Sequence, residues 1–219
     1  MANTSWQTFR EVHARRLGET VAKKCTEKGF LGEYVPTAAA ALEGVLEIIP
    51  PGTSVGVPGS VTVREMGAPE ALVARGCAVV QHWDPSLTTP EARSRRLQEE
   101  LACPYFLTSA NAITFGGELV NVDGTGNRVA ALAWGTSTVV VVASVHKICR
   151  DTVSALQRVR DIATPTNALR LGIDLPCTQV GHCLDCSHPA RSCRATLVLE
   201  RAPSGRTIHV ILVGETLGF

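Results

Sequence analysis

The spacing of apolar residues changes several times along the chain, and each spacing predicts a different element. Over 6–29 the apolar positions recur at roughly helical intervals, and Gly29 supplies a stop. This pattern predicts an amphipathic N-terminal helix. A second helix is predicted over 37–49, with Thr37 as its N-cap and the segment "PPG" at its end.

Beyond residue 50, short apolar runs alternate with helical patterns. "TSVGVPG" and "CAVVQHW" predict strands on either side of a helix over "SVTVREMGAPEALVARG". A further helix is predicted over "TPEARSRRLQEELAC", where Thr89 caps and Pro90 takes the first helical position. The strongest apolar run, 137–145, predicts a buried strand, and a helix with Asp151 as its N-cap is expected over 151–163.

This alternation of strands and helices predicts an α/β fold with a mostly parallel sheet covered on both faces. Near the end of the chain, strand patterns flank the turn "PSGR" and predict a C-terminal β-hairpin. A length of 219 residues fits a single domain. We therefore expect one domain over 1–219, divided into an N-terminal helix (1–30), an α/β core (31–164), a cysteine-rich loop (165–194) and the hairpin (195–219).

The amino-acid composition limits the kinds of molecule that this protein is expected to bind. The 21 basic and 20 acidic residues give a formal net charge of +1, and no stretch concentrates lysine or arginine. We expect no nucleic-acid partner, because phosphate backbones are bound by basic patches. The N-terminal stretch "MANTSWQTFREVHARRL" lacks the apolar segment of a signal peptide, and the longest apolar run is far shorter than the ~20 residues of a membrane span. We expect a cytoplasmic protein that does not enter membranes.

Four of the eight cysteines lie in the segment "PCTQVGHCLDCSHPARSC", with the spacing Cys177-x5-Cys183-x2-Cys186-x6-Cys193. A Cys-x2-Cys pair can direct both sulfurs at one centre, and the flanking thiols can complete a tetrahedral set. Disulfides are disfavoured in a reducing compartment, and thiols that merely fill a core belong on strands or helices. The spacing therefore predicts a metal site. The remaining cysteines are isolated in helix or strand patterns and are expected in the core: Cys25, Cys77, Cys103 and Cys149.

The spacing of these cysteines is compatible with two kinds of metal centre, an iron–sulfur cluster and zinc. Structural zinc sites usually present two separated Cys-x2-Cys pairs, whereas this run is compact and has one central pair. That arrangement favours an iron–sulfur cluster of the 4Fe-4S type, and zinc stays as the alternative because an all-thiolate site suits both.

A second dense stretch is "TFGGELVNVDGTGNRVAAL". A predicted strand carries Glu118, Asn121 and Asp123 into a loop whose glycines permit positive φ and leave backbone N–H groups free for an anion. Arg128, at the end of that loop, is suited to bind a carboxylate or phosphate through two hydrogen bonds. The alternative is an ordinary hairpin turn. The candidate ligand-binding residues of the loop are Gly124, Thr125, Gly126, Asn127 and Arg128.

Two further candidates follow predicted strands. Ser60 and Thr62 open a helix directly after a strand, which is a position for anion binding or for ordinary capping. Lys147 follows the most buried strand, where it is either a solvated charge or a catalytic group. Because the carboxyl ends of parallel strands meet at one edge, these residues and the glycine loop are expected to line one pocket.

With these motifs in view, the sequence resembles the small cysteine-bearing branch of the LUD-domain (lactate-utilisation) family. The resemblance rests on "NAITFGGELVNVDGTGNRVAAL", on "HKICRDTVSALQRVR" followed by "ATPTNALRL", on the cysteine run and on the ending "VILVGETLGF". It implies a three-layer fold similar to NagB, RpiA and CoA transferases. It also implies a link to the oxidation of lactate to pyruvate, together with iron–sulfur partner proteins, but it does not establish an enzyme activity.

Three hypotheses for the function follow. The protein is an iron–sulfur protein of lactate or organic-acid metabolism, with a redox cluster beside an anion pocket. Alternatively, it is a ligand-binding or group-transfer domain with a structural zinc, in which Glu118 is the general base or nucleophile and Lys147 balances charge. The third hypothesis is an accessory subunit that docks on an iron–sulfur or flavin oxidoreductase. The expected small ligand is an organic acid or a phosphorylated compound.

Overall fold

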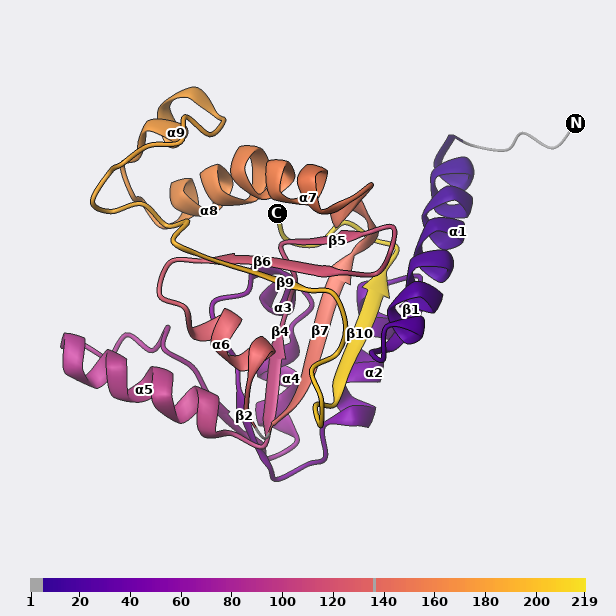
Figure 1. Ribbon diagram of the computed structural model, residues 1–219. Helices are drawn as coiled ribbons and strands as arrows, with labels where there is room; N and C mark the ends of the chain where they lie inside the picture. Colours follow the sequence, from indigo (N-terminus) through magenta and orange to yellow (C-terminus); the bar gives the residue numbers. More distant parts are fainter. Residues whose placement is uncertain (1–5, 136) are drawn as a thin grey trace, which may run out of the picture.

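The computed structural model describes residues 6–135 and 137–219, so residues 1–5 of the predicted N-terminal segment lie outside the described residues. It shows a mixed α/β fold around a central sheet (Figure 1). Every neighbouring pair in this sheet is parallel, which confirms the predicted mostly parallel arrangement. The strand order is β1 (Leu31–Val35), β10 (Ile208–Val213), β7 (Thr138–Ser144), β4 (Tyr105–Thr108), β2 (Ser54–Gly56) and β3 (Ala78–Val80).

Strand β7 shows why this sheet is buried on both faces. Val139 and Val141 pack into one apolar cluster, while Val140 and Val142 pack into a second cluster on the opposite face. A run of β-branched residues suits this position, because successive side chains of a strand point to opposite faces. The predicted buried strand over 137–145 is therefore confirmed as β7.

Helices cover both faces of the sheet. The first cluster is closed by apolar residues of α1 (Trp6–Glu27) and α6 (Asn127–Ala133). The second is closed by α2 (Ala38–Ile48), α3 (Val61–Glu65) and α4 (Ala68–Ala74). At the β3 edge, α5 (Pro90–Ala102) packs beside β2 and β3.

The predicted N-caps are confirmed. The Thr37 hydroxyl accepts a hydrogen bond from the Ala40 N–H at 3.2 Å, and the Thr89 hydroxyl accepts one from the Ala92 N–H at 3.2 Å. Asp151 accepts the Ser154 N–H at 2.8 Å at the start of α7 (Thr152–Arg158). Each cap satisfies a backbone donor that has no partner within its helix.

A second, four-stranded sheet lies against the first cluster and was not predicted. The strand order is β8 (Ile148–Cys149), β5 (Ala112–Thr114), β6 (Leu119–Asp123) and β9 (Ala195–Leu199), with β8 and β5 parallel and the other pairs antiparallel. Strands β5 and β6 place Ile113 and Leu119 in the first cluster. They place Ala112 and Val120 on the opposite face, against α7 and the π-helix η2 (Val159–Ala163).

The C-terminal hairpin predicted over 195–219 is wrong. Strand β9 pairs with β6 in the second sheet, whereas β10 inserts between β1 and β7 in the central sheet. The burial of the two strands gives the reason. Five of the six residues of β10 are buried, which suits a central parallel strand, while β9 has a single buried residue and suits the edge of an antiparallel sheet.

Two further expectations differ from the structure. The helix predicted over "SVTVREMGAPEALVARG" is divided into α3 and α4 because Gly67 adopts a left-handed φ of 70°. The cysteine-rich loop predicted over 165–194 contains two helices, α8 (Thr164–Arg170) and α9 (Pro176–Val180). Of the helices in the described ranges, none is long and apolar enough to cross a membrane.

The packing of α1 on β1 yields a test of the fold. A methyl group at Gly32 of β1 would overlap the Ala22 carbonyl oxygen and lie 2.9 Å from the Cys25 Cβ. We expect Gly32→Ala to reduce the free energy of unfolding by ~1–3 kcal/mol in urea titrations. Gly44→Ala in α2 is the matched control, because its methyl group meets nothing closer than 3.4 Å and is expected to add ~0.5–1 kcal/mol. The same sign of change in both variants would contradict the close approach of α1 and β1.

Candidate functional site

A cavity of about 870 Å³ opens at the carboxyl edge of the central sheet. Figure 1 shows α7 and α8 lying across the end toward which β7 and β10 point. The floor comes from segments that directly follow strands, namely residues 59–62 after β2, 82–85 after β3, 109–111 after β4, and Lys147 after β7. The walls come from the β6–α6 loop, from α8 and from residues 190–192 and 194. Ligands of open parallel sheets bind at this edge because the loops after the strands converge there.

Lys147 is the most buried charged group of the cavity, with 3% of its surface exposed. Its Nζ donates hydrogen bonds to the hydroxyls of Thr62 (2.7 Å) and Ser109 (3.4 Å). Burial, together with the positive charges of Arg158 and Arg128, lowers the pKa of Lys147 to about 7 against the opposing effect of Glu65. These surroundings therefore favour the neutral form of the amine.

The two predicted residues that follow β2 have different contacts. The Ser60 hydroxyl accepts the Val63 N–H at 3.3 Å, so it caps α3, and the residue also lines the cavity. Thr62 lines the cavity as well, and its hydroxyl joins Lys147 to Ser109, whose Oγ donates to it at 3.3 Å. The three side chains form a polar cluster beneath the cavity, at the ends of β2, β4 and β7.

The glycine loop carries β6 into α6 and is not a hairpin turn, so that alternative is wrong. Gly126 adopts a left-handed φ of 94° and precedes the helix, which is the conformation for which glycine is suited. The other predicted loop residues line the cavity, namely Gly124, Thr125, Asn127 and Arg128, together with Asp123.

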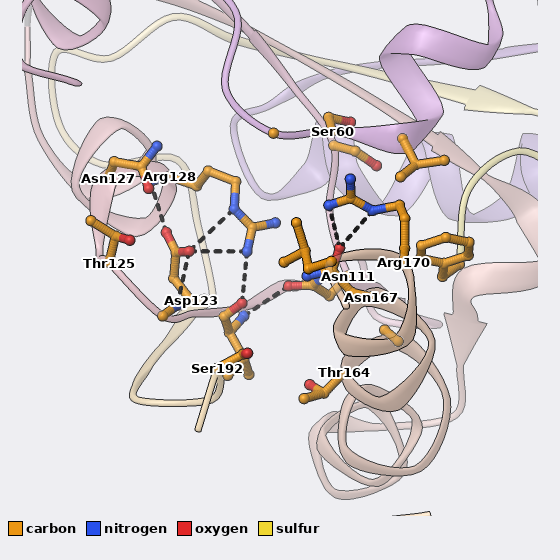
Figure 2. A pocket seen from close by; sticks show the side chains of 18 of the residues that line it. Ser60, Asn111, Asp123, Thr125, Asn127, Arg128, Thr164, Asn167, Arg170 and Ser192 are labelled. Atoms are coloured by element: carbon orange, nitrogen blue, oxygen red, sulfur yellow. Dashed lines mark hydrogen bonds and ion pairs between the residues drawn. The ribbon is translucent and has the colours of Figure 1, made fainter. Parts of the chain in front are cut away.

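Arg128 is held in place by Asp123. The carboxylate accepts hydrogen bonds from the backbone N–H (2.9 Å), Nη2 (3.1 Å) and Nε (3.4 Å) of Arg128, and Nη2 also donates to the Val122 carbonyl (2.9 Å). Figure 2 shows the remaining guanidinium nitrogen directed away from Asp123. The pair therefore orients Arg128 while leaving one of its nitrogens for a ligand.

Besides Gly126, two of the predicted site residues lie away from the cavity lining. Asn121 is buried, and its side-chain NH₂ donates to the Ser109 carbonyl at 3.1 Å. Glu118 lies at the β5–β6 turn, where its carboxylate forms an ion pair with Lys28 at 2.7 Å and accepts the Thr114 hydroxyl. The structure therefore does not bring Glu118 together with Lys147 and Arg128. Its ion pair instead joins the second sheet to Lys28, the residue that follows α1.

Several lining residues were missed by the sequence reasoning. Trp83 lies under two guanidinium groups, those of Arg64 (4.0 Å from the ring centroid) and Arg170 (4.4 Å). Ser109 follows β4 as Lys147 follows β7, so the rule that identified Lys147 could have found it. Arg170 lies in α8, within a segment predicted as loop, and no sequence signal placed it near the sheet.

The lining of the cavity is strongly cationic. Its two carboxylates, Asp84 and Asp123, each have an arginine partner, Arg96 (3.6 Å) and Arg128 (3.1 Å) respectively. The positively charged side chains around it are more numerous: Arg93, Arg128, Lys147, Arg170, Arg191 and Arg194. An excess of positive charge in a concave site attracts small anions.

The four clustered cysteines lie in the segment that forms one wall of the cavity. Burial raises the pKa of the Cys177 thiol, and the negative charge of the thiolates of Cys186, Cys193 and Cys183 raises it further. Cys177 is thus close enough to each of the other three cysteines to interact with it electrostatically. Within 6–135 and 137–219, however, no group of three or more His, Cys, Asp or Glu side chains is arranged to hold a metal ion.

Hydrogen bonds to sulfur already order this segment. The Asp185 N–H donates to the Cys183 sulfur at 3.3 Å, and Arg191 donates to the Cys193 sulfur at 3.4 Å. Arg191 also donates to the carbonyls of Cys186 (2.6 Å) and Cys193 (3.0 Å) while lining the cavity. N–H donors thus reach two of the four sulfurs, those of Cys183 and Cys193, and such donors stabilise negative sulfur.

Comparison with known proteins identifies the family. The sequence model of the LUD-domain family matches residues 18–213 of this chain. The chain belongs to the LUD-domain family. A solved structure of a DUF162 family protein from Deinococcus radiodurans resembles this LUD-domain protein with a TM-score of 0.50 and 14% sequence identity, over 91% of this chain and 98% of that chain. This likeness supports the fold alone. A search of curated proteins gives no match.

The burial of Lys147 in this LUD-domain protein predicts how its stability varies with pH. Between pH 7 and 10.5 the unfolded chain binds a proton that the folded amine does not, so stability rises with pH in that window. Well below pH 7 the buried amine is protonated, so the folded protein bears the full free-energy cost of burying that charge. We expect Lys147→Met to raise the free energy of unfolding by ~1–4 kcal/mol at pH 6 and by progressively less as the pH approaches 10.5.

Urea unfolding at pH 6 and pH 10 measures this difference. Lys24→Met is the matched control, because Lys24 is exposed on α1 and its loss is expected to have an effect that changes little with pH. A gain from Lys147→Met that is the same at both pH values would contradict the buried, weakly basic amine.

Proposed function

We propose that this LUD-domain protein binds a small organic acid or a phosphorylated compound in the cavity and acts in the utilisation of lactate or a related acid. The observation that carries the proposal is the excess of arginine and lysine around a cavity whose two carboxylates already have partners. Guanidinium groups bind carboxylates and phosphates through paired, charge-assisted hydrogen bonds. Lactate utilisation is supported by family membership.

The placement of the cavity also supports a fold similar to NagB, RpiA and CoA transferases. We infer this relationship from the all-parallel central sheet, from the helices on both of its faces and from the cavity at its carboxyl edge. The whole chain, 1–219, then forms one domain, in which the cysteine segment is a wall of the site and not a separate module.

We further propose that Cys177, Cys183, Cys186 and Cys193 hold a metal centre, with a 4Fe-4S cluster favoured over zinc. Support comes from the thiolate-only donor set, from the electrostatic proximity of Cys177 to the other three thiols and from the N–H donors directed at two of the sulfurs. Binding of the metal would draw the four sulfurs closer together than they are in the structure. When bound, an iron–sulfur cluster supplies one-electron chemistry.

A cytoplasmic location forms part of this proposal. All eight cysteines lie among the described residues, and each is a free thiol, which fits a reducing compartment. In such a compartment the cysteine segment would be able to take up iron or zinc without competition from disulfides.

The second candidate function is an accessory subunit of an iron–sulfur or flavin oxidoreductase. The exposed residues of the cysteine segment favour it, because Leu184, with 53% of its surface exposed, and Val180, with 51%, present apolar surface beside the thiols. Co-purification with an oxidoreductase together with the absence of turnover by the isolated protein would support this function.

Calorimetric titration with pyruvate, lactate and inorganic phosphate tests the anion site. We expect binding that weakens as salt increases, because the cavity attracts anions through its charge. Arg128→Gln removes the oriented guanidinium and is expected to weaken binding about tenfold or more. Arg150→Gln is the matched control, because Arg150 is exposed and lies outside the cavity. If no anion binds, or if both variants lose the same affinity, the anion site is refuted.

Metal analysis of protein purified without oxygen tests the cysteine site. We expect iron with acid-labile sulfide, and we expect Cys183→Ser to lose most of it, because a hydroxyl binds iron far less well than a thiolate does. Cys103→Ser is the matched control, since this isolated thiol donates to the Glu99 carbonyl at 3.3 Å, which serine can also do. Stoichiometric zinc without iron would support the alternative metal, and a metal-free protein would refute the site.

A further inference from the structure

We propose that the Lys147 amine condenses with the ketone of a 2-oxo carboxylate to form an imine at the floor of the cavity. This inference rests on the proposed anion-binding function and names a substrate class and a covalent step for the same site. It depends on three properties of Lys147, which are its position, its hydrogen-bond partners and its charged surroundings.

The position of Lys147 is unlike that of every other lysine. The sequence contains four lysines, Lys23, Lys24, Lys28 and Lys147, and its other basic residues are arginines, which do not form imines. Lys23 and Lys24 are exposed on α1, and Lys28 forms an ion pair with Glu118. Only Lys147 lines the cavity. Among the basic side chains of the cavity, it alone can therefore form an imine with a ketone.

The charged groups near Lys147 favour a neutral amine. Arg158 and Arg128 repel its proton, whereas Glu65 is the acidic group that opposes them. Its neighbour His146 adds little positive charge at neutral pH, because partial desolvation of the ring and the positive charges of Arg158 and Lys147 lower the pKa of that imidazole to about 4. The partners of the amine are hydroxyls and not carboxylates. A desolvated lysine next to cationic groups is the usual form of an imine-forming nucleophile.

The hydroxyls of Thr62 and Ser109 are placed to move protons during the reaction. The ammonium first gives one proton to a hydroxyl or water relay. The neutral amine then attacks the ketone carbon, so a C–N bond forms, and a proton passes from the nitrogen to the ketone oxygen to give a carbinolamine. The relayed proton returns to the carbinolamine hydroxyl, which leaves as water while the nitrogen lone pair forms the C=N bond, and the nitrogen keeps its last proton as a protonated imine. Overall, an ammonium and a ketone yield an iminium and water, with no oxidation or reduction. Thr62, 2.7 Å from Nζ, is the closest group that can relay a proton.

The carboxylate of the 2-oxo acid is matched by arginine. Arg128 lines the same cavity, is held by Asp123 and is near enough for its charge to act on the Lys147 amine. We expect a compound with a carboxylate beside a ketone to place its carboxylate at Arg128 and its ketone at Lys147. A simple ketone lacks the charged group, and lactate lacks the carbonyl.

Reductive trapping tests this inference. The intact protein is incubated with pyruvate and sodium borohydride, which reduces an imine to a stable secondary amine, and the modified lysine is located by peptide mass spectrometry. We expect one adduct per chain, at Lys147, and far slower trapping with acetone. Lys147→Arg keeps the positive charge and is expected to abolish the adduct. Thr62→Val is expected to slow trapping about tenfold or more, while Thr62→Ser retains the hydroxyl and trapping near the original rate.

The outcomes separate this inference from the anion site. If calorimetry shows that pyruvate binds but no adduct forms at Lys147, the imine is refuted and the anion site stands. Equal labelling of Lys23, Lys24 and Lys28 would likewise refute a specific imine. If neither binding nor trapping occurs, both proposals fail. Lactate is expected to compete with trapping without forming an adduct, and trapping unaffected by saturating lactate would refute a shared site.

Discussion

The site depends on the burial of one amine at the carboxyl edge of a parallel sheet. Lys147, Thr62 and Ser109 are far apart in the sequence, yet they meet because β7, β2 and β4 run in the same direction and end at the same edge. The sheet fixes these strand ends through the two apolar clusters on its faces. Rigid support of this kind can hold an amine in a desolvated position that a flexible loop would release to water.

The fold could be predicted from the sequence where the signals are local. The valine run of β7 and the N-caps Thr37, Thr89 and Asp151 depend on neighbouring residues, and the structure has them where the pattern placed them. The pairing of strands depends on distant residues. The turn before β10 resembles a hairpin turn, but the burial of β10 on both faces brings it between β1 and β7 instead.

The candidate site, like the fold, could be predicted where its residues follow a local pattern. Ser60, Thr62, Lys147 and the glycine loop follow predicted strands, so the geometry of a parallel sheet was enough to group them at one cavity. Glu118 belonged to the same dense motif but lies at the far turn of β6, where it faces Lys28. The walls formed by α8 and by residues 190–194 depend on how the cysteine segment folds back, which spacing alone does not determine.

The cysteine segment is joined to the cavity through one side chain. Arg191 donates hydrogen bonds to the backbone carbonyls of Cys186 and Cys193 and to the Cys193 sulfur, and it also lines the cavity. A crystal structure of the protein grown with pyruvate would show whether Arg128 and Lys147 bind one 2-oxo acid. We expect ligand density between Arg128 and Lys147, with the carboxylate on the arginine. A ligand bound elsewhere, or a Lys147 side chain turned out to solvent, would contradict this expectation.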